Sequence, residues 1–355
     1  MVGISLLTLV PGISGGSETY ARELCRALAR VGSLEYRAFV PAIAQDAGDG
    51  LPTTTIARYR ASRGPAGRVA AMSLAAARAS PLRRALGVDT LDALHFPLSV
   101  MLPPVDRPPA ATTVLDLQHE EHPEFFSRPE LAYRKRVYGW SVRRSRIVIA
   151  ISEHSRQTLI EHYRLEPDRV RAIPLAVDHE RFFPSSRPVQ SEYLLYPARP
   201  WAHKNHARLY GAFAQLRSEH PGLRLVLTGE GDFGELPEGV EARGRVSADE
   251  LVELYRGAAA LVFPSFYEGF GMPVVEAMAC GCPVACSTVT SLPEVAGSAA
   301  RFFDPTDVDD IAEATDDVLR HRDVWIQRGL ERARAFTWDA NARAHDDVYR
   351  ELASS

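Results

Sequence analysis

The segment between residues 260 and 278 constrains the fold of this 355-residue chain more than any other part. Its apolar run 260–263 predicts a short buried strand, which Pro264 ends. Pro273 suits the first turn of a helix that continues to residue 278. The segment therefore predicts a strand, a loop and a helix in close succession, the repeating unit of α/β proteins.

Two acids and two glycines give the same segment its chemistry. Glu268 is expected in the loop and Glu276 on the helix. Between them, Gly269 and Gly271 leave backbone N–H groups uncovered at the helix N-terminus, where unpaired donors and the helix dipole favour an anion. The segment therefore predicts a site for a phosphorylated ligand.

The rest of the chain repeats the alternation of strand and helix, which predicts parallel, doubly wound sheets. With 46% hydrophobic and 24% charged residues the chain is ordinary globular protein, and its length exceeds what one core usually organises. We therefore expect two domains, with a linker near residues 177–191, where prolines break both periodicities. Further strands are predicted at 2–10, 147–151, 193–196 and 223–227.

Two cations, Arg199 and Lys204, follow the predicted strand 193–196. Lys204 is one of only two lysines among the 41 basic residues, so a specific role is an alternative to an ordinary solvated cation. An ammonium is a point charge and a guanidinium a two-pronged fork, and together they can neutralise a diphosphate without a metal.

These motifs resemble those of the retaining family 4, or group 1, glycosyltransferases, because Glu268 and Glu276 match the family's E-x7-E motif and Arg199 with Lys204 match its basic pair. The resemblance implies the GT-B architecture, in which two Rossmann-like domains face each other. It implies an N-terminal acceptor-binding domain at 1–180, a nucleotide-sugar-binding domain at 190–335, and a helix at 336–355 that returns to the first domain.

The activity that the resemblance implies is transfer of a hexose, with a slight lean to mannose, to an acceptor hydroxyl in glycan, glycolipid or natural-product assembly. The donor is a nucleoside-diphosphate sugar, GDP- or UDP-linked, and no metal or other cofactor is expected. Arg199 and Lys204 would neutralise the departing phosphate, Glu268 would bind the sugar and Glu276 the ribose. The remaining donor contacts fall on Gly15, Gly16, Val246, Gly269, Phe270, Gly271, Met272 and Pro273.

In the first domain, a strand and a Gly-rich turn at 11–17 precede a helix for which Ser17 is the expected N-cap. The turn alone is weak support for nucleotide binding, since glycine also serves tight turns. Farther along, Asp116 and His119 follow another strand, at the sheet edge where α/β proteins bind ligands. The family's histidine before the aspartate is Leu115 here, so His119 is the substitute candidate for the sugar contact and Asp116 the next, while a structural role for His119 stays open.

Charge is unevenly distributed along the chain. Residues 1–185 include 24 basic and 19 acidic residues, whereas the remainder has 17 basic and 26 acidic residues. The basic residues cluster at 58–84 and 134–146, which indicates either solvated helix faces or a surface for anionic or diphosphate lipids. The overall charge of −4 disfavours nucleic acid. No apolar run reaches the roughly 18 residues of a membrane span, so a cytoplasmic protein is expected, with peripheral contact at the inner face of the membrane as a further option.

Other interpretations remain open at this point. Four cysteines are too few for a disulfide framework, and their spacing is a weak metal motif. A GT-B fold also serves sugar-nucleotide epimerases, and Leu115 leaves room for a non-catalytic sugar-nucleotide binder. An NAD-dependent oxidoreductase is disfavoured because the dinucleotide fingerprint is incomplete.

Overall fold

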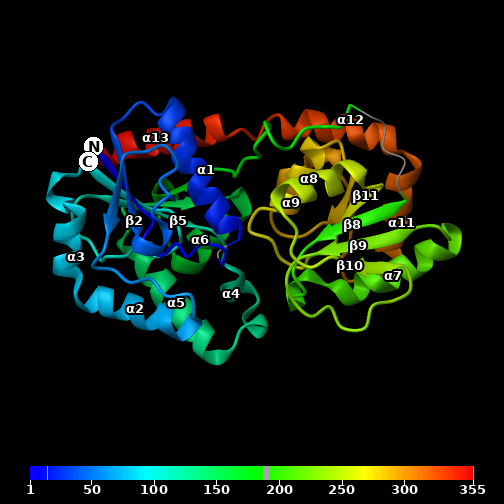
Figure 1. Cartoon of the computed structure of the whole chain (residues 1–355), viewed down its shortest axis with the longest axis horizontal. Helices are drawn as coiled ribbons and strands as arrows, with labels where there is room; N and C mark the ends of the chain where they lie inside the picture. The colour runs from blue at the N-terminus through cyan, green and yellow to red at the C-terminus, as the bar shows by residue number, and fades with distance from the viewer. Residues whose placement is uncertain (14, 187–191, 355) are drawn as a thin grey trace. The chain divides into compact units, whose positions relative to one another are not determined.

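The computed structural model describes residues 1–13, 15–186 and 192–354 and divides into two compact units (Figure 1). One unit comprises Met1–Leu175 with Trp338–Ser355, and the other comprises Ala176–Thr337. Each unit is built on one sheet of parallel strands. The predicted α/β class with two Rossmann-like domains is thereby confirmed.

The first unit has a seven-stranded sheet in the order β3-β2-β1-β4-β5-β6-β7. Because the strand order reverses between β1 and β4, the crevice beside their carboxyl ends is where such a sheet binds ligands. The strands are β1 (Val2–Ser5), β2 (Tyr36–Pro41), β3 (Thr53–Ile56), β4 (Ala93–Phe96), β5 (Ala110–Val114), β6 (Ile147–Ala150) and β7 (Val170–Ala172).

Within the described residues, six α-helices from the first half of the chain and one from its end complete this unit. They are α1 (Gly16–Val31), α2 (Pro65–Ala77), α3 (Ala79–Leu86), α4 (Gln118–Glu121), α5 (Arg128–Arg144), α6 (Glu153–Tyr163) and α13 (Trp338–Ala353).

The prediction that Ser17 caps α1 is wrong. The cap is Gly15, at φ 49° and ψ −126°, and among the described residues no side chain caps the helix. The preceding turn is held instead by Glu18, whose carboxylate accepts the backbone N–H of Gly12 at 2.8 Å. Ser14 of the predicted turn lies outside the described residues.

The C-terminal helix α13 belongs to the first unit because buried polar groups join it to α1, β4 and β5. The Tyr20 hydroxyl lies 3.0 Å from Nε2 of His345 and 2.9 Å from the Thr113 hydroxyl. The Tyr349 hydroxyl lies 2.8 Å from Nδ1 of His95. A fully satisfied buried network of this kind favours one packing of the helix over others.

The second unit has a six-stranded parallel sheet in the order β10-β9-β8-β11-β12-β13, with its reversal between β8 and β11. The strands are β8 (Tyr193–Pro197), β9 (Arg224–Thr228), β10 (Val240–Ala242), β11 (Ala260–Phe263), β12 (Val284–Ser287) and β13 (Arg301–Phe303). The helices are α7 (His206–Glu219), α8 (Ala248–Gly257), α9 (Met272–Ala279), α10 (Leu292–Ala296), α11 (Val308–Arg320) and α12 (Arg322–Ala333).

The boundary between the units differs slightly from the expected one. Residues 176–180, expected in the first domain, fall in the second unit because Val177 pairs with Thr337 and donates its backbone N–H to the Phe336 carbonyl. Phe336 and Thr337, expected in the returning helix, precede α13. Residues 187–191 of the predicted linker lie outside the described residues.

Candidate active site

The candidate site lies where the loops after β8, β9, β11 and β12 meet at the carboxyl edge of the second sheet. All neighbouring strands are parallel, so these loops emerge on the same edge. Since β8 and β11 flank the reversal of strand order, the loops that carry Lys204 and Glu268 lie at the crevice that α/β sheets use for ligands.

Lys204 and Glu268 form an ion pair across this crevice. Nζ of Lys204 lies 2.5 Å from Oε1 of Glu268, and the two side chains are only 14% and 13% exposed. The ammonium also lies 5.5 Å from the centre of the Phe263 ring. Two charges held this far from water interact more strongly than a surface pair, so the sheet edge fixes one cation and one anion in place.

The backbone around Lys204 is fixed by buried hydrogen bonds. Asn205 adopts the left-handed conformation at φ 59°, and its Nδ2 donates to the carbonyls of Pro264 and Pro305. The Tyr196 hydroxyl donates to the Lys204 carbonyl at 2.7 Å. Asparagine tolerates the left-handed region better than other non-glycine residues, so it can end the short 3₁₀ turn Ala202–Lys204 and begin α7.

The loop that carries Glu268 is held by two hydroxyl groups after β12. The backbone N–H of Glu268 donates to the Thr290 hydroxyl at 3.1 Å. The Ser291 hydroxyl lies 3.0 Å from the carbonyls of both Glu268 and Phe270, to one of which it donates. Thr290 has φ 52°, an unusual value for a β-branched residue, which indicates local strain at the site. The sequence analysis did not identify Thr290 or Ser291 as part of the site.

Helix α9 begins where the sequence predicted. Gly271, at φ 100°, precedes it, and Met272 and Pro273 form its first turn, half-buried. Gly269 is half-buried as well. The Phe270 side chain, however, is buried against Phe336 with ring centres 5.6 Å apart, so only the backbone of Phe270 is available to a ligand.

Arg199 lies beside the same edge, and two glycines that were not predicted as site residues shape its surroundings. The Arg199 guanidinium lies 5.5 Å from the centre of the Trp201 ring. A Cβ on Gly229 would lie 2.9 Å from the backbone nitrogen of Arg199, and one on Gly231 would lie 2.6 Å from Cγ of Pro200. The Gly229-Glu230-Gly231 sequence was the available signal for this close approach of the two loops.

Val246 lies in the next loop along this edge. The backbone N–H of Gly229 donates to the Gly244 carbonyl at 2.7 Å, which joins the loops after β9 and β10. Val246 is half-buried and precedes Ser247, whose hydroxyl caps α8 by accepting the N–H of Glu250. The structure thus connects Val246 to the loops of the candidate site.

Glu276 lies on α9, separate from the Lys204–Glu268 pair. Its Oε2 accepts a hydrogen bond from the buried Tyr255 hydroxyl at 2.9 Å. Burial raises the pKa of Glu276 to about 7, and the hydrogen bond from Tyr255 acts in the opposite direction. The carboxyl group is therefore harder to ionise than that of an exposed glutamate.

The remaining candidates lie in the first unit. Gly15 and Gly16 are exposed at the start of α1, with open space where a Cβ would be. Asp116 is partly exposed and lies 3.6 Å from Arg134.

His119 is fully buried beside Phe126 and Tyr138. Burial lowers the pKa of its imidazole, which is therefore neutral at neutral pH. In this structure His119 is not accessible to a sugar, and its position favours the structural role.

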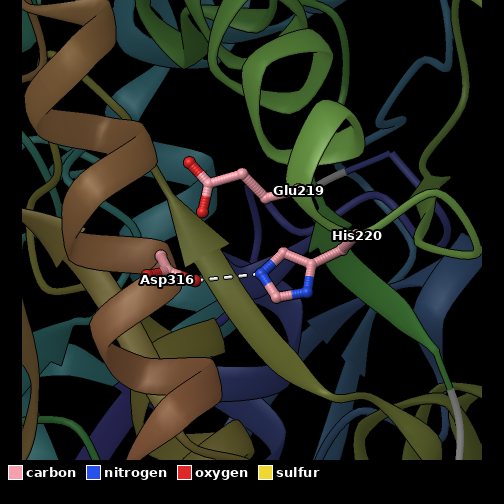
Figure 2. Close-up of side chains that lie close together, drawn as sticks. All are labelled: Glu219, His220 and Asp316. Atoms are coloured by element: carbon pink, nitrogen blue, oxygen red, sulfur yellow. Dashed lines mark hydrogen bonds and ion pairs between the residues drawn. The ribbon is translucent and has the colours of Figure 1, made fainter.

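One cluster in the described part of the chain has the composition of a metal site. Figure 2 shows the His220 imidazole directed at Asp316, 2.9 Å away, with Glu219 beside them. Arg320 forms ion pairs with both Asp316 and Glu219. A guanidinium therefore already supplies the positive charge, and these contacts join the end of α7 to α11.

The family models match the chain in two successive parts. Residues 14–181 match Glycosyltransferase Family 4, and residues 178–334 match Glycosyl transferases group 1. The O-antigen chain mannosyltransferase B of Escherichia coli is 32% identical over 272 residues, which span 68% of this chain and 70% of that protein. The chain belongs to the group 1 glycosyltransferases.

A further relative and a solved structure are also similar to this chain. The MMP alpha-(1->4)-mannosyltransferase of Mycolicibacterium hassiacum is 28% identical over 242 residues, which span 61% of this chain and 58% of that protein. The structure of sucrose-phosphate synthase from Thermosynechococcus elongatus superposes with a TM-score of 0.79 at 21% identity, covering 100% of this chain and 99% of that one. The structural likeness confirms the GT-B fold.

Thr290 should stabilise the loop of this glycosyltransferase that carries Glu268. Thr290→Ala removes the acceptor of the Glu268 N–H, so we expect a loss of about 1–3 kcal/mol in the free energy of unfolding, measured by urea denaturation. Thr290→Ser keeps the hydroxyl and should lose less than half as much. Equal stability of the alanine variant and the wild type would show that the hydrogen bond contributes nothing.

The ionisation of Glu276 should make stability depend on pH. Since folding raises this pKa from 4.5 to about 7, the associated stabilisation is complete below pH 4.5 and is lost as pH rises through 7. Glu276→Gln removes the charge, so its melting temperature should exceed that of the wild type by more at pH 8.5 than at pH 5. The same change at exposed Glu235 is the control. A difference in melting temperature between Glu276→Gln and the wild type that does not change with pH would contradict the raised pKa of Glu276.

Proposed function

We propose that this glycosyltransferase moves a hexose, with mannose the favoured sugar, from a GDP- or UDP-linked donor to an acceptor hydroxyl with retention of anomeric configuration and without a metal. The main structural support for this proposal is the Lys204–Glu268 ion pair at the reversal of strand order. The names of the relatives support mannose, since both the Escherichia coli and the Mycolicibacterium hassiacum proteins are mannosyltransferases.

Charge neutralisation of the leaving diphosphate is the main step that the chain assists in this proposal. As the bond between sugar and phosphate breaks, negative charge grows on the phosphate oxygens. Lys204, Arg199 and the N-terminus of α9 after Gly271 would stabilise that charge, and preorganised donors of this kind act most strongly where water is excluded. These positive groups supply the stabilisation for which other enzymes use a divalent cation.

The two acids have different roles in the proposal. Glu268 is held by Lys204 and by Thr290 through its backbone, so its carboxylate can accept hydrogen bonds from the hydroxyls of the sugar. Glu276 is positioned by Tyr255 to accept hydrogen bonds from the ribose. Because both acids hold the donor, neither serves as a covalent nucleophile, and the acceptor attacks the face of the sugar from which the phosphate leaves.

The acceptor in this proposal is a sugar or lipid-linked hydroxyl of the kind used in polysaccharide or glycolipid assembly. The name of the Escherichia coli relative, an O-antigen chain enzyme, supports this class. Asp116 lies at the carboxyl edge of the first sheet, after β5, and is our candidate for contact with the sugar or the acceptor.

A donor-cleavage assay tests the proposal. The purified protein is incubated with GDP-mannose, UDP-glucose or NAD, and release of nucleoside diphosphate is measured with and without EDTA. We expect one sugar nucleotide to be cleaved, equally in EDTA, and the first sugar product to have the anomeric configuration of the donor by NMR. Cleavage that requires a divalent cation, or product of inverted configuration, would overturn the corresponding part of the proposal.

A further inference from the structure

The exposed residues of helix α2 carry no charge, and the one charged residue of the helix, Arg68, is half-buried. Among those with described side chains, the exposed residues are Val69, Ala70, Ser73, Leu74, Ala76 and Ala77. Val69 is 41% exposed and Leu74 is 54% exposed. The opposite side packs on the core through Ala71, Met72 and Ala75. A surface helix normally turns polar residues to water, so an apolar outer face indicates a surface that is covered in use.

A groove continues this apolar surface toward α5, which lies beside α2 (Figure 1). The groove has a volume of about 510 Å³, and Met72, Val100 and Trp140 are among its lining residues. The Tyr133 hydroxyl contacts the Met72 sulfur at 3.5 Å. Trp140 is 39% exposed, and a tryptophan with one edge in water is typical of residues at the boundary between lipid and water.

Positive charge surrounds the apolar surface. The stretch 50–88, which includes α2 and α3, contains seven arginines and no acid. Arg63 precedes α2 and Arg78 follows it, both exposed. On the groove, Arg136 of α5 is exposed and makes no ion pair within the described residues. An apolar patch with a positive border is complementary to a bilayer with anionic headgroups, whereas a second copy of the chain would bring the same arginines together.

We propose that the outer face of α2 and the adjoining groove, together the α2 surface, dock this enzyme on an anionic membrane. Val69, Leu74 and Trp140 would enter the headgroup boundary and the arginines would contact lipid phosphates. The inference rests on the proposed function only in that docking would bring the enzyme to lipid-linked acceptors. Within the described residues no helix has the length and apolar character needed to cross a bilayer.

Vesicle sedimentation of the full chain tests this proposal. Wild-type protein should sediment with vesicles of phosphatidylcholine and phosphatidylglycerol in a 7:3 ratio, and not with phosphatidylcholine alone. The double variant Val69→Ser/Leu74→Ser should bind at least about tenfold more weakly, because two apolar side chains no longer leave water. Arg63→Gln and Arg78→Gln should each weaken binding about fivefold.

The control removes exposed apolar side chains elsewhere. Leu236→Ser/Val324→Ser alters two residues of the second unit that are 37% and 48% exposed, and it should bind vesicles like the wild type. Donor cleavage without vesicles should be unchanged in the α2 variant, which separates failure of docking from failure of the proposed reaction. Binding that the α2 variant retains would overturn the proposal. So would a wild-type dimer, seen by light scattering, that the α2 variant converts to monomer without any binding to vesicles.

Discussion

Lys204→Ala should lower kcat for donor cleavage by at least about 10²-fold, the loss seen when a single preorganised charge stabiliser is removed from an active site. The Lys204 ammonium is a half-buried cation at the reversal of strand order, and it has three N–H donors, of which the Glu268 carboxylate requires one. Two donors are therefore available to a phosphate. Loss of this stabilisation should appear in kcat more than in KM, because the charge on the leaving group develops in the transition state.

A purely structural role for Lys204 predicts a different result. Removing one member of this half-buried ion pair leaves the other charge uncompensated, which lowers the free energy of unfolding. In that case Lys204→Ala/Glu268→Ala should restore stability, and it should also restore kcat. We expect the double variant to regain stability without regaining kcat. Arg334→Ala, which removes an exposed cation of the same unit, is the control and should leave kcat unchanged.

Arg199 is expected to act on the same leaving group as Lys204. Two cations on one diphosphate do not contribute independently, so the effect of Arg199→Ala should be smaller in the Lys204→Ala background than in the wild type.

Local sequence patterns were sufficient to predict the strand and the helix that surround the site. The strand β11, its termination at Pro264 and the start of α9 near Pro273 follow from apolar runs and from the backbone restrictions of proline. The placement of Lys204 and Glu268 at the same edge also follows, because neighbouring parallel strands have their carboxyl ends on one side.

Contacts between residues that are distant in the sequence could not be predicted from such patterns. Thr290 binds the backbone of Glu268 from 22 residues away, and Tyr255 binds Glu276 from 21 residues away. Neither pair has a spacing that marks it in the sequence, since each depends on which strands become neighbours. The burial of His119 has a related cause: its ring contacts Tyr138 of α5, and only the packing of α5 reveals this.

Gly271→Ala should destabilise the second unit by about 2–5 kcal/mol. Two effects combine at this position. Its φ of 100° is strained for any residue with a Cβ, which costs about 1–2 kcal/mol. The added Cβ would also lie 2.6 Å from Cδ2 of Leu292, a fully buried side chain with little room to move, and overpacking of this kind costs about 1–3 kcal/mol.

A matched glycine separates the strain from the clash. Gly234 has φ 71° and no atom within 4 Å of the position that a Cβ would take, so Gly234→Ala in the same unit should show the backbone strain alone. The clash can be tested directly, because Gly271→Ala should be less damaging in a Leu292→Ala background than in the wild type. The measurement is urea unfolding of all four variants with the wild type.

The same substitution links the fold to the proposed chemistry. Gly271 precedes the first turn of α9, whose N–H groups are the proposed partners of the leaving phosphate, and Leu292 opens α10 directly after the Thr290–Ser291 pair that holds Glu268. A Cβ at residue 271 therefore pushes the start of α9, the proposed phosphate site, against the residues that hold Glu268, the proposed sugar ligand. We expect donor cleavage by Gly271→Ala to remain well below the wild-type rate at temperatures where the variant is fully folded, whereas Gly234→Ala should keep the wild-type rate. Full activity of the folded Gly271→Ala protein would show that the start of α9 takes no part in binding the donor.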